Sequence, residues 1–198
     1  MADLITVAEY KTSEGIAGTK DDARLAVIVP QVSDLVKNYC GTSFIDYYST
    51  DKIEYFNIED NTTNTVILSE CPVTAIDEVA ERTSYSGSYT ALTTTDYEYY
   101  FDSTADAIIR TDKGGNRKAF PKGVGAVKIT YNAGYSETPK DLKLAIFDLV
   151  KYYLRDEHKT QRTLGGATMQ QQGSATLRGS TDFPDHIKRV LDLYRVVI

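Results

Sequence analysis

The stretch from residue 127 to residue 154 constrains the fold of this chain more than any other. Its first part alternates apolar Val127, Ile129 and Tyr131 with polar neighbours. This period of two predicts a strand with one buried face. An Asn-Ala-Gly sequence follows directly and is typical of a tight turn. The strand must therefore end in a tight turn that leads directly into the next element of the chain.

What comes next is predicted to be a capped amphipathic helix over residues 139–156. Thr138 is placed to cap it, Pro139 suits its first position, and Asp141 lies three residues after the cap. The apolar residues fall on one helical face, which predicts packing against other helices. That face consists of Leu142, Ala145, Ile146, Leu149, Val150 and Tyr153.

Further helices are expected on both sides of this stretch. A capping box at 6–9 announces a short first helix. A second helix is expected over 20–39, where Pro30 should kink or divide it and Gly41 should end it. A closing helix is expected near the C-terminal end, and we predict that the 139–156 helix packs against both it and the 20–39 helix. The apolar face of the second helix is Leu25, Ile28, Val29, Val32, Leu35, Val36 and Tyr39, and that of the closing helix is Phe183, Ile187, Val190, Leu191, Tyr194 and Val197.

Between the helical regions, residues 50–131 carry a run of short Thr- and Tyr-rich strand patterns. The candidates are 53–58, 65–68, 75–80, 89–92, 97–101, 107–110 and 126–131. The predicted fold class is α+β: a helical bundle body, made of N-terminal helices plus two C-terminal helices, with an inserted small antiparallel β-sheet or sandwich. We expect one domain over 1–198, helical at 1–45 and again at 138–198.

Composition excludes several function classes. The net charge of −6 argues against a general nucleic-acid binder. The two cysteines, Cys40 and Cys71, form no CxxC pattern and are expected to pack as small hydrophobes in a reducing cytosol. The two histidines, His158 and His186, complete no metal or triad motif. We therefore expect no catalytic residue, no metal and no cofactor, and no segment is apolar enough to predict a membrane span.

Two polar segments remain as candidate contact sites. A basic loop lies between residues 110 and 128, with six basic side chains and one acid, but it lacks the order of a phosphate-binding loop. It is interpreted either as an exposed hairpin or as a contact with an acidic neighbour or with phosphates. Its candidate residues are Lys113, Arg117, Lys118 and Lys122. The second segment, 160–181, is rich in Gly and Gln and too polar to build a core, so we expect it to be flexible.

Four motifs, in order, resemble the head–tail connector (adaptor) proteins of tailed bacteriophages. They are the Tyr-Cys-Gly-Thr-Ser-Phe close of the second helix at 39–44, the apolar strand with Cys-Pro-Val at 66–76, the Thr-Tyr-Asn-Ala-Gly-Tyr turn at 130–135, and Phe-Pro-Asp before the closing helix at 183–185. Each motif alone is a common structural pattern, and their order and spacing carry the resemblance.

The resemblance implies a structural virion protein, assembled in the host cytoplasm, that forms a ring, usually dodecameric, in the neck between head and tail. Its implied partners are the portal protein, neighbouring copies of itself, a downstream neck or tail protein, and genomic DNA passing through the channel without sequence-specific binding. The 160–181 segment is then the expected partner-binding site. Its contact residues are predicted to be Arg162, Leu164, Met169, Gln170, Gln171, Leu177 and Arg178.

Two alternatives stay open at this point. A neck stopper or tail-completion protein would share the virion role without docking on the portal. A Tyr-rich carbohydrate-binding module would use exposed aromatic side chains, of which fifteen tyrosines offer many, although the chain has no tryptophan.

Overall fold

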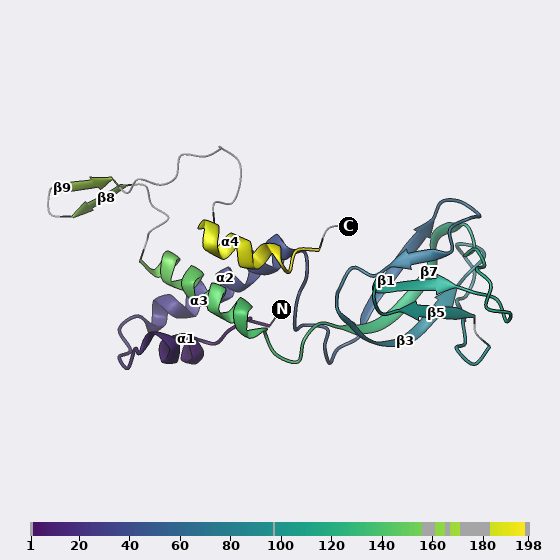
Figure 1. Ribbon diagram of the computed structural model, residues 1–198, viewed down its shortest axis with the longest axis horizontal. Coiled ribbons are helices and arrows are strands. Elements are labelled where there is room, and N and C mark those ends of the chain that lie inside the picture. The colour runs from purple at the N-terminus through teal and green to yellow at the C-terminus, as the bar shows by residue number, and fades with distance from the viewer. Residues whose placement is uncertain (1, 97, 156–160, 165–166, 171–182, 197–198) are drawn as a thin grey trace. The chain divides into compact units, whose positions relative to one another are not determined.

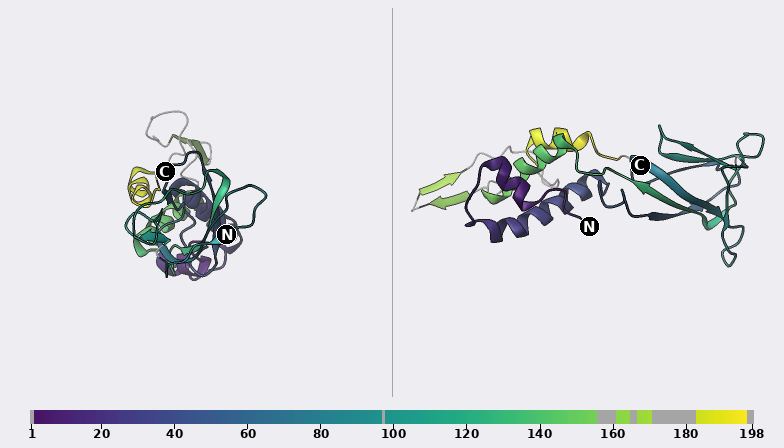
Figure 2. Two further views of the ribbon diagram at one scale, coloured as in Figure 1. Left: turned by 90° about the vertical axis from the view of Figure 1, so that its right-hand side faces the viewer. Right: turned by 90° about the horizontal axis from the view of Figure 1, so that it is seen from below.

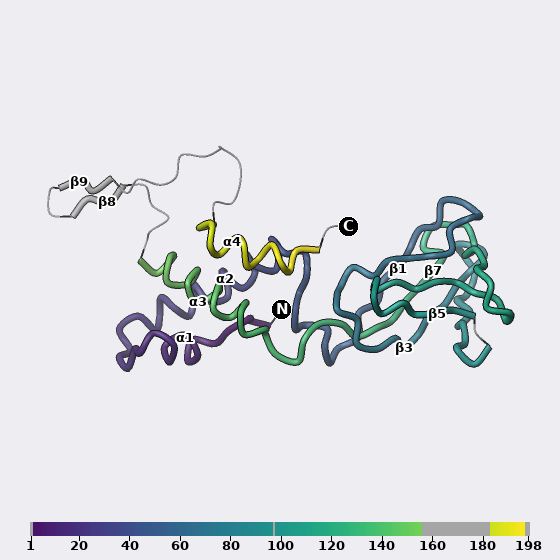
Figure 3. Tube along the Cα trace, in the orientation of Figure 1, coloured from purple at the N-terminus to yellow at the C-terminus, as the bar shows by residue number. Residues whose placement is uncertain are grey.

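The computed structural model describes residues 2–96, 98–155, 161–164, 167–170 and 183–196 (Figures 1 and 2). The chain divides into two compact units. The helical unit comprises Met1–Gly41 and Thr138–Val197, and the β unit comprises Thr42–Glu137. The trace in Figure 3 shows that both ends of the chain contribute to the helical unit, while the β unit is one continuous middle segment.

Four α-helices lie in the described part of the helical unit: α1 (Val7–Glu14), α2 (Asp22–Cys40), α3 (Lys140–Leu154) and α4 (Asp185–Asp192). As expected, α3 packs against both α2 and α4. The predicted capping box is confirmed, because Thr6 Oγ1 accepts from the Glu9 backbone N–H and the Glu9 carboxylate accepts from the Thr6 N–H. The buried faces of the helices meet in one apolar interior. Its members include Leu25, Val29, Val32, Val36, Leu142, Ala145, Ile146, Leu149, Val150, Ile187 and Leu191.

Two details of these helices differ from the sequence-based predictions. Of the two effects predicted for Pro30, division is wrong, because α2 is continuous over Asp22–Cys40; the helix ends at Gly41, as predicted, with a left-handed φ of 72°. Thr138 does not cap α3: Pro139 holds the N-cap position, and no side chain caps the helix. Instead the buried Thr138 hydroxyl donates to the Leu4 carbonyl oxygen at 2.6 Å. Burial against the N-terminal segment therefore takes this side chain away from the helix end.

The β unit holds seven strands in two antiparallel sheets. One sheet has the order β1 (Lys52–Ile58), β7 (Gly123–Ala133), β3 (Val73–Glu81) and β4 (Thr90–Ala91). The other has the order β2 (Thr65–Ile67), β6 (Ala107–Arg110) and β5 (Tyr99–Asp102). All seven predicted strands are present, and only the 107–110 strand has the predicted ends. Both sheets contribute to one buried cluster, which includes Ile58, Val66, Leu68, Val79, Leu92, Ile108, Phe120, Val127, Ile129 and Tyr131.

The predicted fold class, a helical bundle body with a small β insertion, is wrong. The β region is a compact unit with its own core and seven strands, whereas α1 and α4 are only 8 residues long each. The physical reason is the number of inward-facing apolar residues in short strands. Val66 of β2 and Ile108 of β6, for example, are 6% and 0% exposed and belong to the buried cluster of the β unit.

A buried ion pair joins the two sheets. Arg110, at the end of β6, is 2% exposed, and its Nε and Nη2 atoms each donate to the Glu81 carboxylate of β3 at 3.0 Å. Its Nη1 atom donates to the carbonyl oxygens of Glu98 and Thr111. This arrangement pairs the charge and satisfies the guanidinium donors, which is the condition under which a buried ion pair is tolerated.

Candidate functional site

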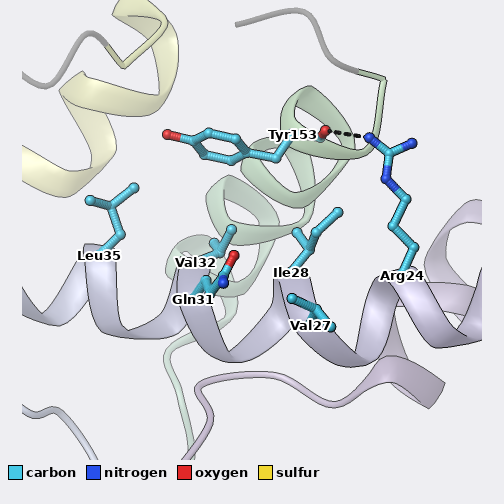
Figure 4. Close-up of a pocket in the computed structure, with 7 residues that line it drawn as sticks. All are labelled: Arg24, Val27, Ile28, Gln31, Val32, Leu35 and Tyr153. Atoms are coloured by element: carbon cyan, nitrogen blue, oxygen red, sulfur yellow. Dashed lines mark hydrogen bonds between the residues drawn. The ribbon is translucent and has the colours of Figure 1, made fainter.

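An apolar groove runs along α2 beside the end of α3 (Figure 4). Its volume is about 610 Å³. Figure 4 shows Tyr153 of α3 facing a row of α2 side chains, with Arg24 at one end donating to the Tyr153 carbonyl oxygen at 3.4 Å. The lining residues are Arg24, Val27, Ile28, Gln31, Val32, Leu35 and Tyr153.

The sequence missed this groove. Ile28 and Leu35 were assigned to the buried face of the helix, yet both are only half-buried and line the groove. Val27, outside that face, is 56% exposed. The available signal was Val27 itself, which widens the apolar face of the helix beyond the residues assigned to the core. Such a groove offers packing surface for apolar side chains.

Hydrogen bonds from two tyrosine hydroxyls connect the C-terminal end of α4 and the residues just after it to α2 and α3. The Tyr39 hydroxyl of α2 donates to Asp192 at 2.6 Å, and the Tyr194 hydroxyl donates to Asp141 of α3 at 2.7 Å. Burial, followed by the hydrogen bond to Asp192, raises the pKa of Tyr39 to about 12. The same Tyr194 bond is the main reason why the pKa of Asp141 is lowered. Both bonds therefore persist at neutral pH and set the position of α4 in the helical unit.

The cysteines and histidines form no reactive constellation in the part of the chain that the structure describes. Cys40 is buried, and burial raises the pKa of its thiol to about 12, so it behaves as a small apolar side chain. Cys71 is half-buried and free. His186 is exposed, and His158 lies outside the described residues. Across the described residues, no three His, Cys, Asp or Glu side chains gather as a metal site would require.

The structure separates the predicted basic residues. Lys113, Arg117 and Lys118 lie in the exposed loop after β6, where Lys113 forms an ion pair with Asp96 at 3.2 Å. The carboxylate of Asp112 organises this loop by accepting from the backbone N–H groups of Gly114 and Asn116. Lys122 lies elsewhere, just before β7, and lines a different hollow. The four residues therefore do not form one cluster.

Part of the predicted partner segment is a two-stranded antiparallel ladder, which the sequence did not predict. Strand β8 (Gln161–Leu164) pairs with β9 (Ala167–Gln170), so that Arg162 lies opposite Met169 in the backbone register. Leu164 and Gln170 lie in these strands as well. Gln171, Leu177 and Arg178 lie outside the described residues. The assignment of this segment to partner binding stays a prediction.

No helix in the described ranges has the length and apolarity to cross a bilayer.

Comparison with known proteins identifies the family of this chain. Residues 3–197 match the head completion protein family, and the chain therefore belongs to this family. A head completion protein of Escherichia phage T5 is 31% identical over 77 residues, which are 39% of this chain and 42% of that relative. The matched region thus spans less than half of the length of this curated relative. The predicted relationship to the head–tail proteins of tailed bacteriophages is confirmed at the level of the family.

Two solved structures share the fold over nearly the whole chain. One is from the neck of an empty gene transfer agent particle computed with C6 symmetry; it has a TM-score of 0.60 and 16% identity, and the match covers 98% of this chain and 91% of that one. The other is from the neck of a native particle computed with C12 symmetry, with a TM-score of 0.58, 15% identity, and coverage of 100% and 95%. Both units of the chain are included in these matches.

Proposed function

We propose that this protein forms a closed ring, dodecameric by analogy, that sits in the neck under the portal protein and extends the DNA channel toward the tail. The observation that carries the proposal is the shared fold with neck proteins of particles computed with C6 and C12 symmetry, over at least 98% of this chain. Membership of the head completion protein family supports the same position in the virion.

In this proposal the protein acts by assembly and has no catalytic activity. Genomic DNA passes through the ring without sequence-specific binding. A net charge of −6 suits such a channel, because many fixed cations would grip the phosphate backbone rather than let it slide. The portal, neighbouring copies and a downstream neck or tail protein are the expected partners.

The contact with the portal is assigned to the 160–181 segment. Four glycines give this segment conformational freedom, and three consecutive glutamines can donate and accept hydrogen bonds. Leu164, Met169 and Leu177 can supply apolar anchors. Arg162 and Arg178 can pair with acids on the portal or on a neighbouring copy.

Replacing residues 164–178 by a short Gly-Ser bridge tests this assignment. The melting temperature should stay nearly unchanged, because the buried core of the helical unit lies in other residues. Binding to the purified portal should be abolished in sedimentation or native mass spectrometry. A deletion variant that still forms portal-bound rings with normal affinity would make the segment a linker, and docking would pass to α4 or to the loop after β6.

A further inference from the structure

A hollow with two highly exposed side chains, Tyr85 and Val124, lies where β3 ends and β7 begins. Its volume is about 360 Å³. Tyr85 is 77% exposed and Val124 is 65% exposed, and Arg82 and Lys122 line the same hollow. We call Arg82, Tyr85, Lys122 and Val124 the Tyr85 surface. It belongs entirely to the β unit and shares no residue with the α2 groove or with the 160–181 segment.

Arg82 fixes the geometry of this surface from within. Its Nε donates to the Gly125 carbonyl oxygen at 3.0 Å, its Nη1 to that of Tyr85 at 2.8 Å, and its Nη2 to that of Val124 at 3.1 Å. The guanidinium carbon lies 4.9 Å from the ring centroid of Tyr85 and 4.8 Å from that of Tyr89. The loop after β3 and the start of β7 are thereby tied together, and Tyr85 and Val124 are held in place.

Such an arrangement has the properties of a binding hot spot. An exposed Tyr that is already fixed loses little conformational entropy when a partner covers it, and Tyr and Arg are enriched among residues that dominate interfaces. The aromatic surface also continues beyond the hollow. Tyr55 of β1 is 60% exposed, and its ring centroid lies 6.1 Å from that of Tyr89.

The charge of the surface indicates which chemical groups a partner would present to it. The eight lining residues include two cations, Arg82 and Lys122, and no acid. Arg82 is already engaged by three carbonyl oxygens, so the exposed Lys122 is the cation offered to a ligand. A carboxylate beside an apolar side chain would match both Lys122 and the Tyr85–Val124 pair. A duplex phosphate backbone fits less well, because it would leave the two apolar side chains uncovered and would meet a single cation.

We infer that the Tyr85 surface is the docking site for the downstream neck or tail protein, through a segment in which an acidic residue neighbours an apolar one. This inference rests on the proposed function, which supplies the partner. It divides the contacts between the two units: the helical unit binds the portal through the 160–181 segment, and the β unit binds the next component through this surface.

Photo-crosslinking from position 85 tests the inference in the assembled particle. A benzophenone amino acid placed at Tyr85 should crosslink to the downstream neck protein, at a site within a few residues of an Asp or Glu, as mapped by mass spectrometry. The same amino acid at Tyr100, which is 59% exposed on β5 of the same unit, is the matched control and should not give that product. A product with the portal, with DNA or with another copy of this chain would overturn the inference, as would no product at position 85.

Binding to the purified downstream protein gives a second readout. Tyr85→Ala and Lys122→Glu should each weaken binding about tenfold or more, whereas Tyr100→Ala and Lys20→Glu should change it less than about twofold. Ring formation on the portal is measured in the same samples. Normal rings with unchanged downstream affinity would refute the Tyr85 surface alone, whereas the loss of portal-bound rings in the wild-type protein would refute the proposed function itself.

Discussion

Arg110→Met should destabilise the β unit by about 3–5 kcal/mol. Removal of the guanidinium leaves the Glu81 carboxylate without its two bonds of 3.0 Å and leaves the carbonyl oxygens of Glu98 and Thr111 without their donor. The Arg110 side chain is 3% exposed, so water cannot easily replace what it provided. Urea unfolding followed by circular dichroism measures the change in free energy.

A second variant separates the destabilisation caused by an unpaired carboxylate from the net contribution of the ion pair to stability. Glu81→Leu combined with Arg110→Met should be less destabilised than Arg110→Met alone, because no partly buried carboxylate remains unpaired. A single variant that loses less than about 1 kcal/mol would mean that the two sheets do not depend on this ion pair.

Leu149→Ala should cost about 2–5 kcal/mol and should lower the soluble yield before it affects any specific interface. Leu149 is 0% exposed on α3, the helix that packs against both α2 and α4, so its truncation leaves a cavity at the centre of the helical unit. Thermal unfolding of the purified variant provides the measurement.

The same helix supplies a matched control. Leu144 is 63% exposed, so Leu144→Ala makes the same chemical change where no cavity can form, and we expect its effect to stay within about 0.5 kcal/mol. Equal melting temperatures for Leu149→Ala and the wild type would contradict the packing described for the helical unit.

Local patterns in the sequence predicted local structure well. The capping box at Thr6, the end of α2 at Gly41 and the buried face of α3 all follow from signals within a few residues, and all are present. The strands were also found, because alternation of apolar and polar residues is read within each strand. The prediction failed on the relative importance of the helical and β regions for the fold. Whether seven short strands form a small insertion or a unit with its own core depends on pairing between distant segments, such as β1 and β3 on either side of β7.

The surfaces were harder to predict than the elements. Thr138 looked like a helix cap, but a contact with Leu4, 134 residues away, decided its role. Lys122 was grouped with Lys113 because they are close in sequence, yet it lines the hollow beside Arg82. Arg82 itself carried no signal, since its importance comes from three carbonyl oxygens, two of them on the β7 side of the hollow. Family resemblance supplied the role in the virion, but no short motif could show which side chains the fold brings together.

The central claim is that this chain forms a ring on the portal. Electron microscopy of the purified protein incubated with its portal tests it most directly. We expect a closed ring of this protein seated on the tail-facing side of the portal and coaxial with the DNA channel. Portal particles without added density, with this protein remaining monomeric beside them, would contradict it.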